Sequence, residues 1–560
     1  MLSATNRLPS GWTLFAIALS IVLAVLVLNP LIRLLLLSVS SPDGDWAFGN
    51  YAAAFSRARY VQAFWNSMQL GVAVTAMCLV LAVPLAWAVS RTDMPGKGTI
   101  RMLVLCTFVM PPYLGAVGWI LLAGPNAGWL NQVSRAAVGA GFFDIYSFTG
   151  LAFVIAIYTF PFLFIFVQSA LDVVSSEMEE AANILGAGTV RTAMKITLPL
   201  VLPALLAGCI ITFLEAISLV GTPALIALPA RVNVITTQLM QFFAPPIRAE
   251  VAAAYTMPLL LVTVALYALQ QRLIRRRGYV TLGGKGGERR MIALGPWRWL
   301  ATGYAWFVIS LSLILPCLVL AQAAFAKAWG RGWRIDNLTL DNFAYLLFRH
   351  PAARGSVVNS FTYAAVAATL ALLLALGIAY IVSRRLVRMG NVLGVICMAP
   401  FVVPGIVLAI AFYGAYAPAP FSLYGTAAIL ILAFTTRFLP IGFTSTSASL
   451  RSINPEMEEA VRILGGGRTL AIRKVLAPLM KRSLVGAWLL VFIPATRELS
   501  TAMFLYGPNT RPMSIMLLDL SEEGNFELLA ALGFLLLAAT AVVVGIGMKL
   551  VGRDFMLKRT

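Results

Sequence analysis

The residues best placed to do chemistry in this chain form one short polar pattern that occurs twice. The first copy consists of Glu180-Ala181-Ala182, Gly186 and Ile196-Thr197-Leu198-Pro199, and the second of Glu459-Ala460-Val461, Gly465 and Val475-Leu476-Ala477-Pro478. In both copies the glycine follows the glutamate by six positions and the proline follows it by nineteen. The copies lie 279 residues apart in a chain of 560. A polar element repeated at half the chain length predicts a pair of docking sites for a soluble partner that is itself present twice.

Residues for covalent catalysis or metal binding are sparse. His350 is the one histidine, and no HExxH or Cys/His cluster occurs, so a metal hydrolase is not expected. The chain also lacks the GxxxxGK[ST] loop that cradles nucleotide phosphates, and we expect no enzyme activity and no ATP hydrolysis by this polypeptide. The five cysteines all fall in apolar runs and are expected to be packing residues: Cys78, Cys106, Cys209, Cys317 and Cys397.

The composition predicts an all-α polytopic membrane protein. The chain is 60% hydrophobic and 11% charged, whereas an ordinary soluble domain carries about 25% charged residues. Since no alternating barrel pattern is present, helices are the remaining way to span a bilayer. Twelve runs are long enough: 13–39, 66–90, 102–123, 148–171, 200–226, 251–271, 299–325, 359–383, 391–416, 424–449, 483–506 and 527–550.

The net charge of +20 follows the predicted topology. With the first run taken as a retained anchor and the N-terminus inside, most Lys and Arg residues fall in the inside loops. This is the positive-inside rule, and it predicts a multi-pass protein with both termini cytoplasmic. Nucleic acid is therefore not an expected partner.

The chain divides into two similar halves. We expect a first half at 1–271, a Gly- and Arg-rich cytoplasmic linker at 272–298, and a second half at 299–560. Since each half holds six predicted spans, the repeats are parallel rather than inverted. Three further motifs recur at an offset of 293: Asn66-Ser67 as Asn359-Ser360, Val89-Ser90-Arg91 as Val382-Ser383-Arg384, and Phe108-Val109-Met110-Pro111 as Phe401-Val402-Val403-Pro404.

Each copy of the polar pattern predicts a short amphipathic helix in a cytoplasmic loop, at 172–199 and 450–481. One face of each helix is apolar, its first turn is acidic, and a glycine ends it. A helix lying on lipid is the alternative, but such helices carry basic polar faces. Docking of a protein is therefore favoured. The apolar faces comprise Met178, Ala181, Ile184 and Leu185, and Met457, Ala460, Ile463 and Leu464.

The pattern resembles the EAA motif of inner-membrane permease subunits of binding-protein-dependent ABC importers. The first copy matches every defined position, while Val461, Val475 and Ala477 depart from it in the second. The resemblance covers the whole chain, as two fused six-helix bundles of the type I permease fold with about twelve transmembrane helices. It implies a bacterial inner-membrane location, two copies of a separate ATPase that binds ATP and Mg, and a periplasmic or extracellular solute-binding protein. It also implies that the ATPase contacts are Glu180, Ala181, Ala182, Leu185, Gly186, Glu459, Ala460, Leu464 and Gly465.

Four charged residues inside predicted spans are candidates for the translocation path: Glu215, Arg437, Arg497 and Glu498. Ionisable groups at this depth cost about 2.5–3.5 kcal/mol on insertion scales and usually face a cavity or a partner. Internal ion pairing, for example of Arg437 with Glu498, remains an alternative. Prolines within the spans predict kinks or broken helices, although each could be an ordinary membrane-helix proline: Pro84, Pro111, Pro112, Pro161, Pro404 and Pro494.

The fused arrangement resembles the ferric-iron permeases most, and carboxylates suit a hard trivalent cation. Thiamine, aminoethylphosphonate and polyamine permeases are alternatives of the same class. An ion-coupled secondary transporter is a more distant one, because it has no reason to keep two EAA loops. The residues leave open whether any of them binds a metal.

Overall fold

The computed structural model describes residues 11–41, 45–46, 48–174, 179, 181–182, 184–276 and 291–551. Over these ranges the regular elements are helices, and the β contacts are three isolated bridges. Ten of the described helices are long and apolar enough to cross a membrane, or twelve if each of two bent pairs counts as one span. The predicted all-α polytopic class is therefore confirmed.

Corresponding helices follow the same order in the two halves of the sequence. The first half contains α1 (Gly11–Leu23), η1 (Ala24–Leu28), α2 (Asn29–Ser38), α3 (Gly49–Phe55), α4 (Ala58–Arg91), α5 (Lys97–Val109), α6 (Pro112–Ala123), α7 (Trp129–Val138), α8 (Phe148–Val173), α10 (Thr189–Thr192), η2 (Ala193–Thr197), α11 (Leu198–Ser218), α12 (Gly221–Ile226), α13 (Ile235–Phe243) and α14 (Ala249–Arg276). The second contains α15 (Trp297–Ile309), η3 (Ser310–Ile314), α16 (Leu315–Ala324), η4 (Trp329–Arg331), η5 (Ile335–Asn337), α17 (Asp341–Ala344), η6 (Tyr345–Arg349), α18 (Pro351–Ser383), α19 (Gly390–Met398), η7 (Ala399–Phe401), α20 (Gly405–Tyr416), α21 (Ala427–Arg451), α22 (Glu456–Ile463), α23 (Arg468–Ala471), η8 (Ile472–Leu476), α24 (Ala477–Thr496), η9 (Ala502–Phe504), α25 (Met513–Glu522) and α26 (Phe526–Val551).

Two predicted spans are sharply bent rather than continuous. The run 102–123 is divided into α5 and α6, which meet at 98°, and the run 391–416 into α19–η7 and α20, which meet at 110°. The breaks fall at Pro111-Pro112 and at Pro404, where the ring removes a backbone donor and disfavours helix in the residue before it. By contrast, Pro84, Pro161 and Pro494 lie inside continuous helices.

The first span of each sequence half packs on the other half. Side chains of α1 and η1, such as Leu23 and Val27, share a buried cluster with Ile378 and Leu439 of the second half. In the opposite direction, Tyr304 of α15 donates a hydrogen bond of 2.6 Å to the carbonyl of Val80 in α4. The two six-span halves therefore interlock, because each carries a helix of its partner's bundle.

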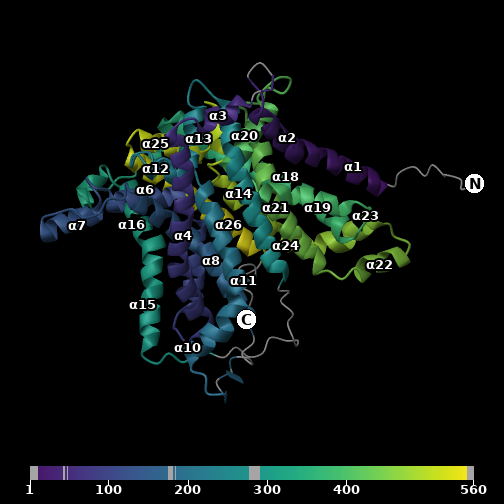
Figure 1. Ribbon diagram of the computed structural model, residues 1–560. Helices are drawn as coiled ribbons and strands as arrows, with labels where there is room; N and C mark the ends of the chain where they lie inside the picture. The colour runs from purple at the N-terminus through teal and green to yellow at the C-terminus, as the bar shows by residue number, and fades with distance from the viewer. Residues whose placement is uncertain are drawn as a thin grey trace, which may run out of the picture.

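The repeated Asn-Ser motif holds an outer helix in each half. The backbone N–H of Ile235 donates to Ser67 Oγ at 2.8 Å, and that of Met513 donates to Ser360 Oγ at 2.7 Å. Both bonds anchor the start of a short helix on a long one, α13 on α4 and α25 on α18. In Figure 1 these helices lie together at the top, whereas α10 lies at the bottom and α22 at the lower right.

Candidate coupling site and central passage

The second polar loop forms a short helix, α22, that is anchored by a buried ion pair. Arg384, at the end of α18, places its Nε 2.6 Å from Oε1 of Glu458. Tyr380 of α18 donates a hydrogen bond of 2.9 Å to Oε2 of the same carboxylate. Both oxygens of Glu458 are thus used by α18, and this fixes the orientation of α22 against the bundle. Removing one partner of such a buried pair leaves an uncompensated charge, which is strongly destabilising.

The first polar loop is held in the same way. Arg91, at the end of α4, lies 3.5 Å from Glu179, measured between Nη1 and Oε2. Thr197 donates a hydrogen bond of 2.7 Å to Oε1 of Glu179. The Arg91 side chain is 3% exposed and that of Glu179 is 9% exposed, so this pair is also buried.

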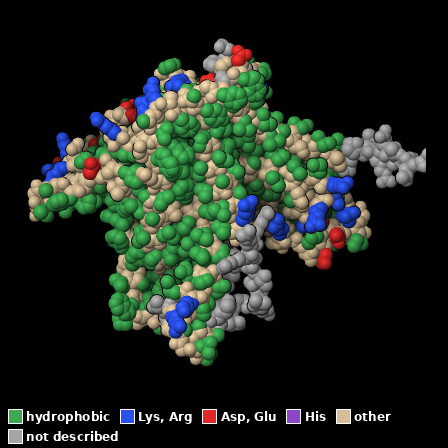
Figure 2. Space-filling model, viewed as in Figure 1, with side chains coloured by type: hydrophobic (Ala, Val, Ile, Leu, Met, Phe, Trp, Pro, Cys, Tyr) green, Lys and Arg blue, Asp and Glu red, His purple; other side chains and the backbone are tan. Residues whose placement is uncertain are grey.

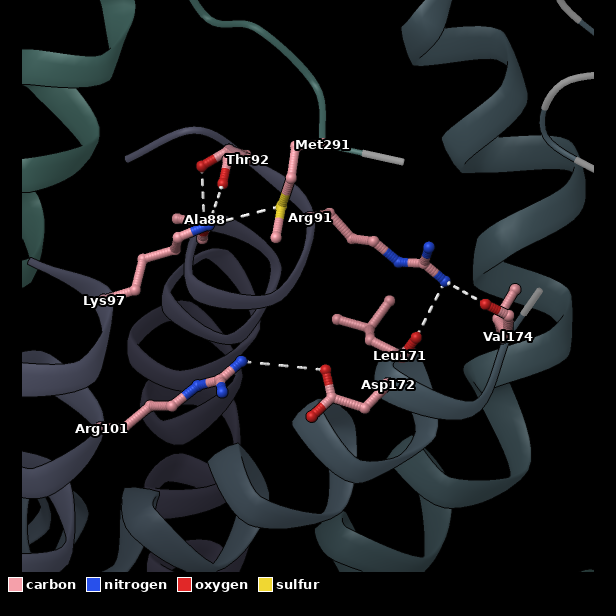
Figure 3. A network of polar contacts seen from close by, with 9 residues as sticks. All are labelled: Ala88, Arg91, Thr92, Lys97, Arg101, Leu171, Asp172, Val174 and Met291. Carbon is pink, nitrogen blue, oxygen red and sulfur yellow. Dashed lines mark hydrogen bonds and ion pairs between the residues drawn. The ribbon is translucent and has the colours of Figure 1, made fainter. Parts of the chain in front are cut away.

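Arg91 also fastens the end of α8, as Figure 3 shows. Its Nη2 donates to the carbonyls of Leu171 at 2.8 Å and Val174 at 2.9 Å, which are among the last carbonyls of that helix. A cation at a helix C-terminus satisfies these acceptors and complements the helix dipole. The guanidinium therefore joins α4, α8 and the polar loop at one point.

A second layer of contacts surrounds Arg91 in the first half. Arg101 of α5 lies 3.9 Å from Asp172 of α8, and Lys97 donates to the carbonyl of Thr92 at 2.8 Å and to Met291 Sδ at 3.3 Å (Figure 3). The N–H of Ile292 donates to the carbonyl of Arg91 at 2.8 Å. The last part of the predicted linker, at 291–292, therefore lies against the turn between α4 and α5.

Each polar loop exposes two adjacent apolar side chains just before its glycine. Ile184 and Leu185 are 86% and 87% exposed, and Ile463 and Leu464 are 85% and 87% exposed. The next residue in each loop is a glycine with positive φ, +80° at Gly186 and +82° at Gly465. Glycine adopts this conformation without the steric penalty of a Cβ, so it ends the helix and leaves the apolar pair at its tip.

The predicted apolar faces point outward. Ala181, Ile184 and Leu185 are exposed in the first loop, as are Met457, Ala460, Ile463 and Leu464 in the second. Ala182 is instead buried and Glu459 is exposed, while Glu180 and Met178 lie outside the described residues. Glu179 and Glu458 face the bundle and are paired there, while the apolar side chains are exposed to a partner. Large exposed apolar groups of this kind mark interaction sites.

Sequence reasoning missed the anchoring residues. Glu179 and Glu458 were expected only as acidic residues of a first turn, and Arg91 and Arg384 only as members of a repeated Val-Ser-Arg motif. The repetition of both motifs at constant spacing was the available signal. Their pairing depends on the packing of α4 on α8 and of α18 on α21, which no local pattern reveals.

The four candidate path residues come together at the centre, where the halves meet. Each is half-buried, and Glu215 lies within electrostatic range of Arg437, Arg497 and Glu498. Within the described part of the chain no ion pair within 4.0 Å joins any two of them, so the alternative of an Arg437–Glu498 pair is not observed. Glu498 instead accepts hydrogen bonds from the N–H of Thr501 at 2.8 Å and from its hydroxyl at 3.0 Å.

Both arginines bind carbonyls that the broken spans leave free. Arg497 donates to the carbonyls of Phe108 and Val109, at 2.8 and 2.7 Å, at the end of α5. Arg437 donates to the carbonyl of Val403 at 2.5 Å, just before α20. Backbone acceptors at a helix break inside a membrane must find such donors, because lipid supplies none. The second half thus provides the cation for the broken span of each half.

The chain is similar in sequence to several transport permeases. A family described as "Binding-protein-dependent transport system inner membrane component" matches residues 48–279. The ferric transport system permease protein FbpB of Actinobacillus pleuropneumoniae is 28% identical over 85% of this chain and 68% of its own length. The putative FbpB of Haemophilus influenzae is 28% identical over 84% of this chain and 74% of its own. The molybdenum permease ModB of the same organism is 31% identical over 28% of this chain and 67% of its own.

A solved bacterial ABC transporter for alginate import is 16% identical, with a TM-score of 0.41, and the match covers 48% of this chain and 96% of that one. The chain belongs to the family of inner-membrane components of binding-protein-dependent transport systems. It is an ABC importer permease of the fused, two-half form, and a multi-pass membrane protein.

Proposed function

We propose that this permease couples two copies of a separate ATPase to the import of ferric iron. The observation that carries the coupling is the pair of exposed apolar tips, Ile184-Leu185 and Ile463-Leu464, each on a loop clamped by a buried Arg–Glu pair. A rigidly anchored tip transmits a push from a partner to the helices behind it. The ATP and Mg belong to the ATPases, and a periplasmic binding protein delivers the solute to the opposite end.

The same proposal places the chain in a bacterial inner membrane with both termini and both coupling loops in the cytoplasm. The ATPases close on binding ATP, and their motion reaches α4 through Arg91 and α18 through Arg384. Because the broken spans α5–α6 and α19–α20 are held by Arg497 and Arg437, movement of the long helices changes the centre of the passage. No covalent chemistry is required of the permease.

Ferric iron is supported by the extent of the similarity. The two ferric permeases match 85% and 84% of this chain, across both halves, whereas the molybdenum permeases match 28% to 47% of it. Glu215 and Glu498 supply hard oxygen donors. Among the described residues no group of three or more His, Cys, Asp or Glu could hold a metal ion.

An oxyanion such as molybdate is the second candidate. Arg437 and Arg497 lie at the same centre, and guanidinium groups suit oxyanions. Cells lacking this chain, complemented with the wild type, would be tested for uptake of radioactive ferric ion and of radioactive molybdate. We expect restored ferric uptake; restoration of molybdate uptake alone would refute the iron assignment and leave the coupling proposal intact.

The coupling proposal is tested separately by Leu185→Asp with Leu464→Asp. Both side chains are exposed, so the bundle should fold normally, while a charge on each tip should weaken ATPase binding by about 2 kcal/mol, or about thirty-fold. Co-purification of the ATPase with the permease is the measurement. The matched control is Thr469→Asp, an exposed position in α23. Unchanged co-purification of the double variant would refute docking at the tips.

A further inference from the structure

The α7 arm, made of α7 and residues 139–143 after it, has no counterpart in the second half. The outer loop of the first half runs from 124 to 147, whereas the corresponding loop of the second runs from 417 to 426. The additional length forms α7, which extends from the side of the molecule, at the left of Figure 1. The arm lies at the end of the bundle opposite α10 and the polar loops.

The arm is firmly attached through its polar side chains. Asn131 is fully buried, and its Nδ2 donates to the carbonyls of Gly124 at 2.9 Å and Phe143 at 2.7 Å. Its Oδ1 accepts from the N–H of Phe143 at 2.9 Å. Arg135 donates to the carbonyls of Asn126, at 2.8 Å, and Pro125. The polar groups of the arm are therefore turned toward its own chain.

Its apolar side chains are left outside. Val133, Val138 and Phe142 are 67%, 69% and 66% exposed, and Phe143 is 45% exposed. Trp129, Val133 and Ala137 recur at the spacing of one helix face. The exposed apolar side chains on this face favour an apolar environment on that side of the helix.

The position of the arm favours lipid as that environment. Trp129 lies against Trp333, with ring centroids 6.3 Å apart, and Trp333 is 59% exposed. Tryptophan concentrates at the headgroup level, where its ring is half in lipid. Figure 2 shows hydrophobic side chains along the side of the arm that faces the spans, in continuity with the apolar flank of α15 and α16. No acidic residue occurs in α7, so nothing on that helix is repelled by phosphate.

We propose that the α7 arm is an interfacial anchor that lies on the phospholipid leaflet opposite the coupling loops, with Val133 and Phe142 in the acyl boundary. Amphipathic helices bind this boundary through buried apolar area. An anchor at this place would fix the depth at which this end of the bundle sits in the leaflet. This inference does not depend on which solute is carried.

The test uses spin labels on Val133→Cys and, as a matched control one residue away on the exposed flank, Gln132→Cys. Each full-length variant carries the label in phosphatidylcholine vesicles, with the unsubstituted chain as the blank for its five native cysteines. Oxygen concentrates in lipid, whereas a water-soluble nickel chelate does not. We expect the label at Val133 to be relaxed several-fold more by oxygen than by the chelate, and the label at Gln132 to show a lower ratio.

Equal and strong relaxation by the chelate at both positions would place the arm in water and refute the proposal. Shielding of Val133 that arises only when a solute-binding protein is added would also refute it, because that surface would then bind protein. Since Val133 is exposed, its replacement should not impair folding; Ala137→Cys, one helical turn further along the same face and also exposed, provides a second position if labelling at Val133 is incomplete.

Discussion

Arg91–Glu179 in the first half and Arg384–Glu458 in the second occupy equivalent places and make the same buried pair. Tyr158 of α8 and Arg437 of α21 also occupy equivalent places, 279 residues apart, but they differ in charge and in contacts. Tyr158 fills the space beside Gly115, where a Cβ would come within 2.1 Å of its ring. Arg437 instead reaches the carbonyl of Val403.

Two further pairs of equivalent positions near the centre also differ in charge. Glu215 corresponds to Pro494, and Ser218 corresponds to Arg497. The coupling ends are alike because a duplicated partner would meet both. Under the proposed function a single solute passes the centre, so its two sides would be free to differ; one half supplies both arginines. At the outer end the halves differ as well, because the α7 arm occurs only in the first half.

The largest expected effect comes from breaking the Arg91–Glu179 and Arg384–Glu458 ion pairs. Arg384→Ala should leave Glu458 buried and unpaired at a local cost of about 3–5 kcal/mol. Hydrogen exchange across residues 451–476 should then accelerate, and transport should be lost. Arg91→Ala should have a comparable effect on its own loop if the two ends are equivalent.

Arg388→Ala, an exposed cation close to Arg384, is the control and should leave exchange unchanged. Unaltered exchange in Arg384→Ala would show that the ion pair does not hold α22.

A smaller loss of transport is expected from substitution of Gly186 and Gly465, the glycines with positive φ. Gly465→Val places a β-branched residue at φ +82°, which costs roughly 1–2 kcal/mol. Because no atom lies within 4 Å of an added Cβ, the cost is conformational, and the loop tip should shift while the bundle stays folded. ATP hydrolysis should become uncoupled from uptake, as it should in Gly186→Val. Gly467→Val, at an ordinary φ with open space, is the control; normal coupling in the Gly186→Val, Gly465→Val double variant would contradict the docking role.

Substitution of the central carboxylates tests one residue in each half, Glu215 and Glu498. Glu215→Gln should slow uptake of a cation by about five-fold, equivalent to about 1 kcal/mol, because it removes a charge facing the passage. Glu498→Gln keeps an oxygen for Thr501 and should also slow uptake without loss of ATPase binding. Glu523→Gln, exposed beyond α25, serves as the control in the same uptake assay. If both variants transport normally, these residues do not line the path.

The smallest effect is expected at Asp172, whose counterpart in the second half is Arg451. Its contact with Arg101 is 3.9 Å long and partly exposed, so Asp172→Asn should lower stability by no more than about 1 kcal/mol. Thermal unfolding of the purified variant measures this. A loss as large as that of Arg91→Ala would show that Asp172 belongs to the anchor itself.

Much of this organisation could be predicted from the residues. Hydrophobic runs placed the spans, because a helix must cover about 30 Å of hydrocarbon with apolar side chains. The repeated Glu, Gly and Pro positions located both polar loops, because each residue type acts locally, through helix dipole, positive φ or a missing donor. The family followed from the same residues.

Other features were decided only by tertiary structure. The prolines predicted kinks or broken helices, but not which of them would divide a span: Pro111-Pro112 and Pro404 do, at 98° and 110°, and arginines of distant helices bind the freed carbonyls there. The exchange of first spans, the Arg–Glu anchors and the convergence of Glu215 with Arg437 join residues far apart in the chain. Periodicity reports what a helix needs on each face, whereas the identity of its neighbour is set by how all the helices pack together.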